Sequence, residues 1–129
     1  MAKVFDSSAV LAVLYGEPGA EKVRSELSDG ILSAVNAAEV ITVLVRKGMP
    51  LKEAVTALHK TLLKMQEFSV DTAVKTASLW SPQVRSRGLS LGDRACLATG
   101  LLLQLPVVTA ERNWAGLDVS GLKIELIRS

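Results

Sequence analysis

Short apolar runs alternate along the chain with longer stretches in which apolar residues recur every three or four positions. The short runs predict strands, and the periodic stretches predict helices. We expect strands at residues 4–5, 31–33, 68–70, 106–109 and 123–127. We expect helices over residues 7–15, 20–27, 37–47, 50–65, 71–87 and 90–103. This alternation predicts an α/β fold in which helices flank a mostly parallel central sheet of about four to five strands.

Polar residues stand at the start of several expected helices, where a side chain can accept a hydrogen bond from a free backbone N–H group. The predicted N-terminal caps are Ser7, Asn36, Asp71 and Ser90. Glycine and proline between the first two helices, in the segment 16–19, mark a break in the chain.

Composition places the chain among globular proteins. Its 129 residues are 49% hydrophobic and 22% charged, which suggests one domain over residues 1–129 and excludes a disordered chain. Cys96 is the only cysteine, which excludes a disulfide scaffold and fits a reducing, cytoplasmic compartment. No apolar run reaches the roughly 18 residues of a membrane helix, so we expect no membrane contact. A formal net charge of +2 is compatible with a nucleic-acid partner without implying one.

Four acidic residues occupy positions that differ from ordinary surface charge. Asp6 directly follows the first expected strand, and Glu111 comes two residues after the 106–109 strand. Glu39 and Asp93 lie near the N-termini of expected helices, and Gly92 leaves room beside Asp93 for a close approach. The carboxyl ends of parallel strands meet at the edge of the sheet where ligands bind, and the connections bring these helix ends to the same edge. We therefore expect the four carboxylates to converge on one cleft.

Each acid taken alone also has an ordinary structural interpretation as a helix cap, a partner of a helix dipole or a loop residue. Together the acids repel one another, by roughly 3 kcal/mol for a pair about 5 Å apart at an effective dielectric constant of about 20. Four of them remain ionised near neutral pH only if a cation or shared protons offset this repulsion. Oxygen ligands suit Mg²⁺ or Mn²⁺, whereas one histidine and one cysteine do not make a zinc site. The pattern predicts metal-activated attack of water on a phosphodiester, with one or two ions.

Four segments of the chain resemble the PIN domain. They are Val4–Ala12 (VFDSSAVLA), Asn36–Val40 (NAAEV), Leu91–Ala98 (LGDRACLA) and Val107–Trp114 (VVTAERNW). The chain resembles in particular the VapC-type ribonucleases, the toxins of type II toxin–antitoxin pairs, and the resemblance covers essentially the whole sequence. It implies a PIN-like three-layer fold, a parallel sheet flanked by helices, and Mg²⁺- or Mn²⁺-dependent cleavage of RNA.

Residue by residue, the resemblance implies that Asp6, Glu39 and Asp93 are catalytic acids that bind the metal. Ser7 and Thr109 match hydroxyl positions that commonly support the site in this family.

The fourth acid of the family is usually an aspartate, and Glu111 takes its place here with a side chain longer by one methylene group. Glu111 is thus a candidate catalytic and metal-binding residue, and Asn113 is the alternative ligand for a second ion. Arg94 and Arg112 each directly follow a proposed site acid. Either arginine can contact a substrate phosphate, or serve as a surface cation that balances the acids.

The resemblance also implies partners. RNA is the implied substrate, and a small antitoxin protein is implied to block the site and to bind operator DNA. The implied assembly is a homodimer that reaches operator DNA only through the antitoxin. The alternative is a PIN-like binding module that has lost activity and acts through a protein partner; the glutamate at position 111 keeps this alternative open.

Overall fold

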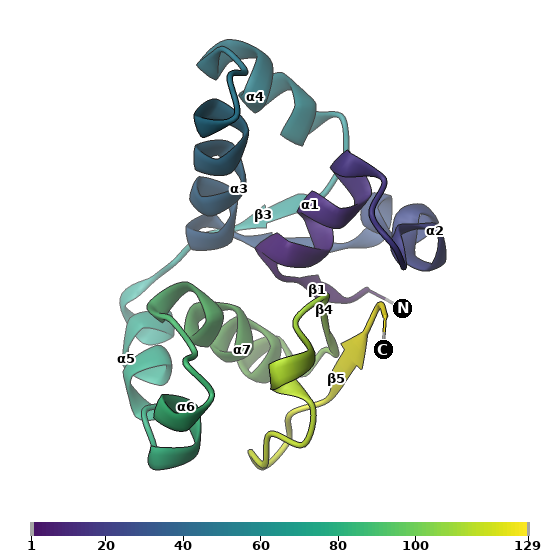
Figure 1. Cartoon of the computed structure of the whole chain (residues 1–129). Helices are drawn as coiled ribbons and strands as arrows, with labels where there is room; N and C mark the ends of the chain where they lie inside the picture. The colour runs from purple at the N-terminus through teal and green to yellow at the C-terminus, as the bar shows by residue number, and fades with distance from the viewer. Residues whose placement is uncertain (1, 129) are drawn as a thin grey trace.

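The computed structural model describes residues 2–128, and its centre is a parallel β-sheet (Figure 1). Within these residues the strands are β1 (Val4–Phe5), β2 (Ile31–Ser33), β3 (Lys64–Gln66), β4 (Val107–Thr109) and β5 (Ile124–Leu126). They form one sheet in the order β3-β2-β1-β4-β5, and every neighbouring pair is parallel. The predicted α/β fold is confirmed, and the described sheet has five strands.

Helices cover both faces of this sheet (Figure 1). One face carries α1 (Ser7–Tyr15), α2 (Ala20–Val23), the 3₁₀ helix η1 (Arg24–Asp29), α3 (Ala34–Arg46) and α4 (Leu51–His59). The other face carries α5 (Val70–Ser78), α6 (Pro82–Ser86) and α7 (Leu91–Leu103). A second 3₁₀ helix, η2 (Arg112–Trp114), follows β4. Among the described residues, no helix has both the length and the apolar character needed to cross a membrane.

The neighbouring strands β1 and β4 supply side chains to the apolar core on both faces of the sheet. Phe5 and Val108 belong to the cluster that packs against α1, α3 and α4. Val4 and Val107 belong to the cluster that packs against α7, and all four side chains are fully buried. Successive residues of a strand point to opposite faces, so even the two-residue strand β1 contributes to both clusters.

Strand β1 is the point in the sheet at which the order of the strands along the chain reverses. The chain moves outward from β1 to β2 and β3, and then returns to the other side of β1 with β4 and β5. Phe5 pairs with Leu32 on one side and with Val108 on the other. In open α/β sheets a crevice forms at the carboxyl ends of the strands where the order reverses. The residues that follow β1 and β4 therefore lie beside each other at this crevice.

Three predicted helix caps are wrong. Ser33 caps α3, since its Oγ accepts a hydrogen bond from the Val35 N–H group at 3.3 Å, and Asn36 lies inside the helix. The chain enters α1 through Asp6 and not through Ser7. In the same way, Ser69 caps α5 in place of the predicted Asp71.

The helix predicted over residues 50–65 ends earlier, at His59. Leu62 continues the apolar periodicity, but its φ of 64° lies in the left-handed region, so the chain cannot continue as an α-helix through this residue. The next residues form β3, where Met65 pairs with Leu32 of β2. The strand predicted at 68–70 is therefore wrong, and α5 already begins at Val70.

Two other predicted helices are broken into shorter ones. The 71–87 prediction covers α5 and α6, which are separated because Pro82 lacks an N–H group and disfavours a helical residue before it. Ser81 then caps α6 by accepting a hydrogen bond from the Val84 N–H group at 3.2 Å. The 20–27 prediction is an α-helix only to Val23 and continues as η1.

Candidate active site

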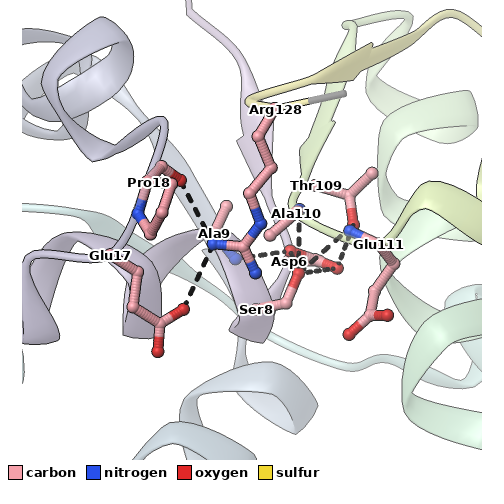
Figure 2. Close-up of polar contacts among 9 residues, drawn as sticks. All are labelled: Asp6, Ser8, Ala9, Glu17, Pro18, Thr109, Ala110, Glu111 and Arg128. Atoms are coloured by element: carbon pink, nitrogen blue, oxygen red, sulfur yellow. Dashed lines mark hydrogen bonds and ion pairs between the residues drawn. The ribbon is translucent and has the colours of Figure 1, made fainter.

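Asp6 directly follows β1, at the carboxyl end of the central strand. Its side chain is 2% exposed and caps α1, because Oδ1 accepts a hydrogen bond from the Ala9 N–H group at 2.8 Å. The Ser8 hydroxyl donates to the same carboxylate at 2.8 Å. From the end of β4, Thr109 Oγ1 donates to Oδ2 at 2.6 Å (Figure 2). The Asp6 carboxylate thus joins the first turn of α1 to the neighbouring strand.

The two hydroxyl groups extend this network into the segment after β4. Ser8 Oγ accepts a hydrogen bond from the Ala110 N–H group at 3.0 Å. Thr109 Oγ1 accepts one from the Glu111 N–H group, also at 3.0 Å. Figure 2 shows these contacts converging on Asp6 from α1 and from the end of β4. The two strand ends at the crevice are therefore held together around one buried acid.

The environment of Asp6 favours its protonated form. Burial is the main cause that raises the pKa of Asp6 from 3.8 to about 7, and the negative charge of Asp93 acts in the same direction. The hydrogen bonds from Thr109, Ala9 and Ser8 lower the pKa and only partly oppose the effect of burial. Near neutral pH, a large fraction of Asp6 therefore carries a proton unless a cation stabilises the carboxylate.

Glu39 lies on α3 and is held through one of its two oxygens. Oε1 accepts hydrogen bonds from Asn36 Nδ2 at 2.8 Å and from Ser7 Oγ at 3.1 Å. Oε2 accepts no hydrogen bond from any other described residue. The backbone of α7 comes so close that a Cβ atom on Gly92 would lie 2.7 Å from Glu39 Cδ. The close approach expected at Gly92 is thus an approach to the Glu39 carboxylate.

Asp93 is the third residue of α7 and part of a capping box. Its backbone N–H group donates to Ser90 Oγ at 3.1 Å, and its Oδ2 accepts from the Ser90 N–H group at 2.9 Å. Asp93 thus has the structural role that an acid often has in the first turn of a helix. Its Oδ1 has no hydrogen-bond partner in the described part of the chain, so one oxygen remains available for a ligand.

Cys96 lies one turn further along α7, within electrostatic reach of three of the acids. Its side chain is fully buried, and burial raises the pKa of the thiol well above its usual range. The negative charges of Asp6, Asp93 and Glu39, in this order, raise the pKa of Cys96 further. Three of the four predicted site acids therefore lie near the N-terminal half of α7.

Glu111 and Asn113 take no part in the hydrogen bonds of these three acids. Glu111 is exposed, and its carboxylate forms no hydrogen bond with another described residue (Figure 2). Asn113 Nδ2 donates to the carbonyl oxygen of Arg87 at 2.7 Å, which ties η2 to the end of α6.

The two candidate arginines differ in their surroundings. Arg94 packs toward α5, where Nη1 donates to the carbonyl oxygen of Thr76 at 3.2 Å. Its guanidinium group lies over the ring of Trp80, 5.6 Å from the centroid. Arg112 lies in η2 and is exposed. Arg94 therefore contributes to the contact between α7 and α5, and Arg112 is the more accessible of the two cations.

The three acids supply the oxygen ligands that a hard divalent ion prefers, but their carboxylates stand further apart than the ligands of one bound ion. Within residues 2–128, no three histidine, cysteine, aspartate or glutamate side chains stand close enough to hold a metal ion. The donor set fits the ion because Glu39 Oε2 and Asp93 Oδ1 accept no hydrogen bond from described residues. Carboxylate oxygens are the ligands that Mg²⁺ and Mn²⁺ prefer.

The sequence itself matches a known family model. The model of the PIN domain matches residues 3–119, which is most of the chain. The chain belongs to the PIN domain family. A comparison of this PIN domain with curated proteins finds no match.

Solved structures share the fold of this PIN domain. A toxin–antitoxin complex from Klebsiella pneumoniae matches with a TM-score of 0.69 and 20% identity, over 93% of this chain and 94% of that one. VapBC2 from Rickettsia felis, bound to a DNA fragment from its promoter, matches with a TM-score of 0.73 and 16% identity over 98% of both chains. DNA-bound VapBC from Salmonella typhimurium matches with a TM-score of 0.71 and 16% identity, over 98% of this chain and 99% of that one. The PIN-like fold inferred from the sequence is confirmed.

Ser8 and Asn36 of this PIN domain hydrogen-bond two of the candidate site acids, and the sequence pattern does not single them out as site residues. In the adjacent pair Ser7 and Ser8, the first hydroxyl contacts Glu39 and the second contacts Asp6. The signal for Asn36 was its spacing, since a residue three positions before Glu39 shares its helix face.

Proposed function

We propose that this PIN domain is a metal-dependent endoribonuclease that acts as the toxin of a toxin–antitoxin pair. The observation that carries the proposal is geometric: Asp93 lies in the first turn of α7, and the Glu39 carboxylate lies against Gly92 in the same turn. Asp6 follows β1 at the crevice between β1 and β4. Membership of the PIN domain family and the fold shared with toxin–antitoxin complexes support it.

Asp6, Glu39 and Asp93 are the residues that would hold Mg²⁺ or Mn²⁺, and Glu111 is the candidate ligand for a second ion. Such an ion lowers the pKa of a bound water and offsets charge in the transition state of phosphodiester hydrolysis. Binding a cation requires Asp6 to lose the proton that its pKa of about 7 favours in the metal-free protein. We therefore expect metal binding to weaken below neutral pH.

The chain's own contribution is to hold the acids in place before substrate binds. Hydroxyl groups orient Asp6, and Glu39 is held by Oε1 so that Oε2 stays open. Asp93 is fixed by Oδ2 in the capping box, which leaves Oδ1 open. Arg112, which is exposed beside Glu111, is the arginine better placed to contact a substrate phosphate.

The partners follow from the same proposal. RNA is the substrate, a cognate antitoxin protein is the inhibitor, and a second copy of the chain completes a homodimer. Operator DNA is reached only through the antitoxin. The VapBC proteins from Rickettsia felis and Salmonella typhimurium, which share this fold, were solved bound to DNA.

One observation favours the alternative of an inactive binding module. Glu111 is exposed and shares no hydrogen bond with the three acids, and no three of the described acids stand at ligand spacing. A module of this kind would fold in the same way and act through its protein partner, without cleaving RNA.

Cleavage of a mixed RNA pool separates the two functions. We would assay the purified chain, free of any partner, with Mg²⁺, with Mn²⁺ and with EDTA. Asp6→Asn is the test variant, and Asp29→Asn is its matched control because Asp29 is exposed at the opposite, amino edge of the sheet. The proposal predicts cleavage that requires metal, falls by about 100-fold or more in Asp6→Asn and is unchanged in Asp29→Asn. A well-folded chain that cleaves nothing with either metal is the binding module.

A further inference from the structure

Asn36 is a buried polar residue whose hydrogen bonds join two elements of the site. It is the third residue of α3, and its side chain is 1% exposed. One donor group, Nδ2, donates to Glu39 Oε1 at 2.8 Å and to the carbonyl oxygen of Gly92 at 3.1 Å. The first acceptor is a site acid on α3, and the second lies in the first turn of α7, beside Asp93.

The contact between Glu39 and α7 has little room for adjustment. A Cβ atom on Gly92 would overlap Glu39 Oε2 and would lie 2.8 Å from Oε1. The half-buried Glu39 carboxylate thus lies against the α7 backbone at Gly92 and accepts a hydrogen bond from the Asn36 amide. Because Asp93 is the residue after Gly92, the same contacts fix the position of Asp93 relative to Glu39.

The burial of the polar Asn36 side chain destabilises the folded state, so apolar packing is not a reason for an asparagine at this position. Its Oδ1 is buried and accepts no hydrogen bond from the described residues. A buried polar atom without a partner destabilises the folded state, because it loses its hydrogen bond to water. An apolar residue here would avoid this cost but would leave Glu39 Oε1 and the Gly92 carbonyl oxygen without their shared donor.

We propose that Asn36 is a positioning residue that sets the spacing between the Glu39 and Asp93 carboxylates, so that both present an oxygen to one divalent ion. This inference rests on the proposed function, because it concerns the same site. Residues that hydrogen-bond a metal ligand typically change metal affinity by about 10–100-fold when they are removed. As a positioning residue, Asn36 contacts neither substrate nor ion and acts through Glu39 and α7.

The test is a calorimetric titration of the full chain with Mn²⁺ alone, without RNA. We expect Asn36→Ala to weaken Mn²⁺ binding by about 10–100-fold. Val40→Ala is the control, because Val40 is fully buried on the same helix and belongs to the apolar cluster. This control loses core packing and should bind Mn²⁺ as the wild type does. Thermal unfolding without metal compares the stability losses of the two variants.

Metal dependence gives a second readout that a purely structural role would not change. RNA cleavage by Asn36→Ala should recover toward the wild-type rate at saturating Mn²⁺, with an unchanged KM for RNA. Wild-type Mn²⁺ affinity in Asn36→Ala would overturn the inference, as would a wild type that binds no Mn²⁺. A wild type that binds Mn²⁺ but cleaves no RNA would contradict the proposed function alone, because the affinity comparison still tests Asn36.

Gly92→Ala tests the same spacing if Asn36→Ala does not fold. It keeps every hydrogen-bonding group of the site, and alanine is favoured over glycine inside a helix. Its methyl group, however, would displace the Glu39 carboxylate. We expect weaker Mn²⁺ binding from a folded protein; Mn²⁺ binding equal to that of the wild type would overturn the inference.

Discussion

Asp6 connects the stability of the fold to the chemistry of the site. Its pKa is about 7 in the folded chain, mainly because of burial, and 3.8 is the ordinary value expected after unfolding. Between these two pH values the folded state binds more protons than the unfolded state. The free energy of unfolding of the metal-free protein therefore falls as pH rises from about 4 to about 7, and this contribution is level above that range.

Asp6→Asn should remove this pH dependence. At pH 8 without metal, the variant should gain up to about 4 kcal/mol in free energy of unfolding over the wild type, because no buried charge has to form. At pH 4 the wild-type side chain is protonated when folded, and the two proteins should be similar. Urea denaturation at both pH values measures the difference. A variant less stable than the wild type at pH 8 would contradict the role given to burial.

The location of a site residue could be predicted from the sequence where the residue directly follows a strand. Asp6 directly follows a strand, and in a parallel sheet the carboxyl ends of all strands lie at the same edge. Ser8 and Asn36 depend on helix faces instead. A helix start misplaced by a few residues, as for α3, changes which side chain is read as a cap and which as part of a face. Contacts across 56 residues, as from Asn36 to Gly92, have no local signal.

At the scale of elements, the start of α7 combines capping with the proposed chemistry. Ser90→Ala removes the acceptor for the Asp93 N–H group but keeps the backbone donor to the Asp93 carboxylate. We expect a stability loss of about 1 kcal/mol with cleavage retained. Asp93→Asn keeps the fold but removes the charge, and should lose most cleavage. Urea denaturation and the RNA assay measure both; equal loss of activity in the two folded variants would contradict this separation.

The helices whose ends were predicted correctly have strong local signals. Ser90 caps α7, and the apolar pattern of this helix continues to Leu103. The 50–65 prediction fails because Leu62 keeps the helical spacing while β3 pairs with β2. Sheet pairing is a tertiary interaction, and it overrides the local preference of this segment. The strand was consequently predicted a few residues too late.

At the scale of the whole molecule, the fold class could be predicted because strands and helices alternate along the chain. The order of the strands could not, since it depends on which strands pair across long distances. That order places β1 beside β4 and so joins Asp6 to Thr109, which are 103 residues apart in the sequence. The spacing of the three acids depends on this arrangement as well as on the residues themselves.

Metal binding should stabilise the whole folded chain, because the site exists only when the sheet and α7 are assembled. At a Mn²⁺ concentration of about 100 times Kd, the expected gain is about 2.7 kcal/mol. Thermal denaturation with and without Mn²⁺ measures it as a rise in Tm. Asp6→Asn should show little rise and Asp29→Asn a full one. Equal rises in Asp6→Asn and the wild type would place the ion elsewhere.

In the proposed ribonuclease, Asp6, Glu39 and Asp93 form one site for a divalent ion. A crystal of the chain soaked with Mn²⁺ tests it most directly, because the anomalous signal locates the ion without assumptions about activity. We expect a manganese peak in contact with carboxylate oxygens of these three residues, between the end of β1 and the start of α7. A fully occupied peak elsewhere, with none among these carboxylates, would contradict it.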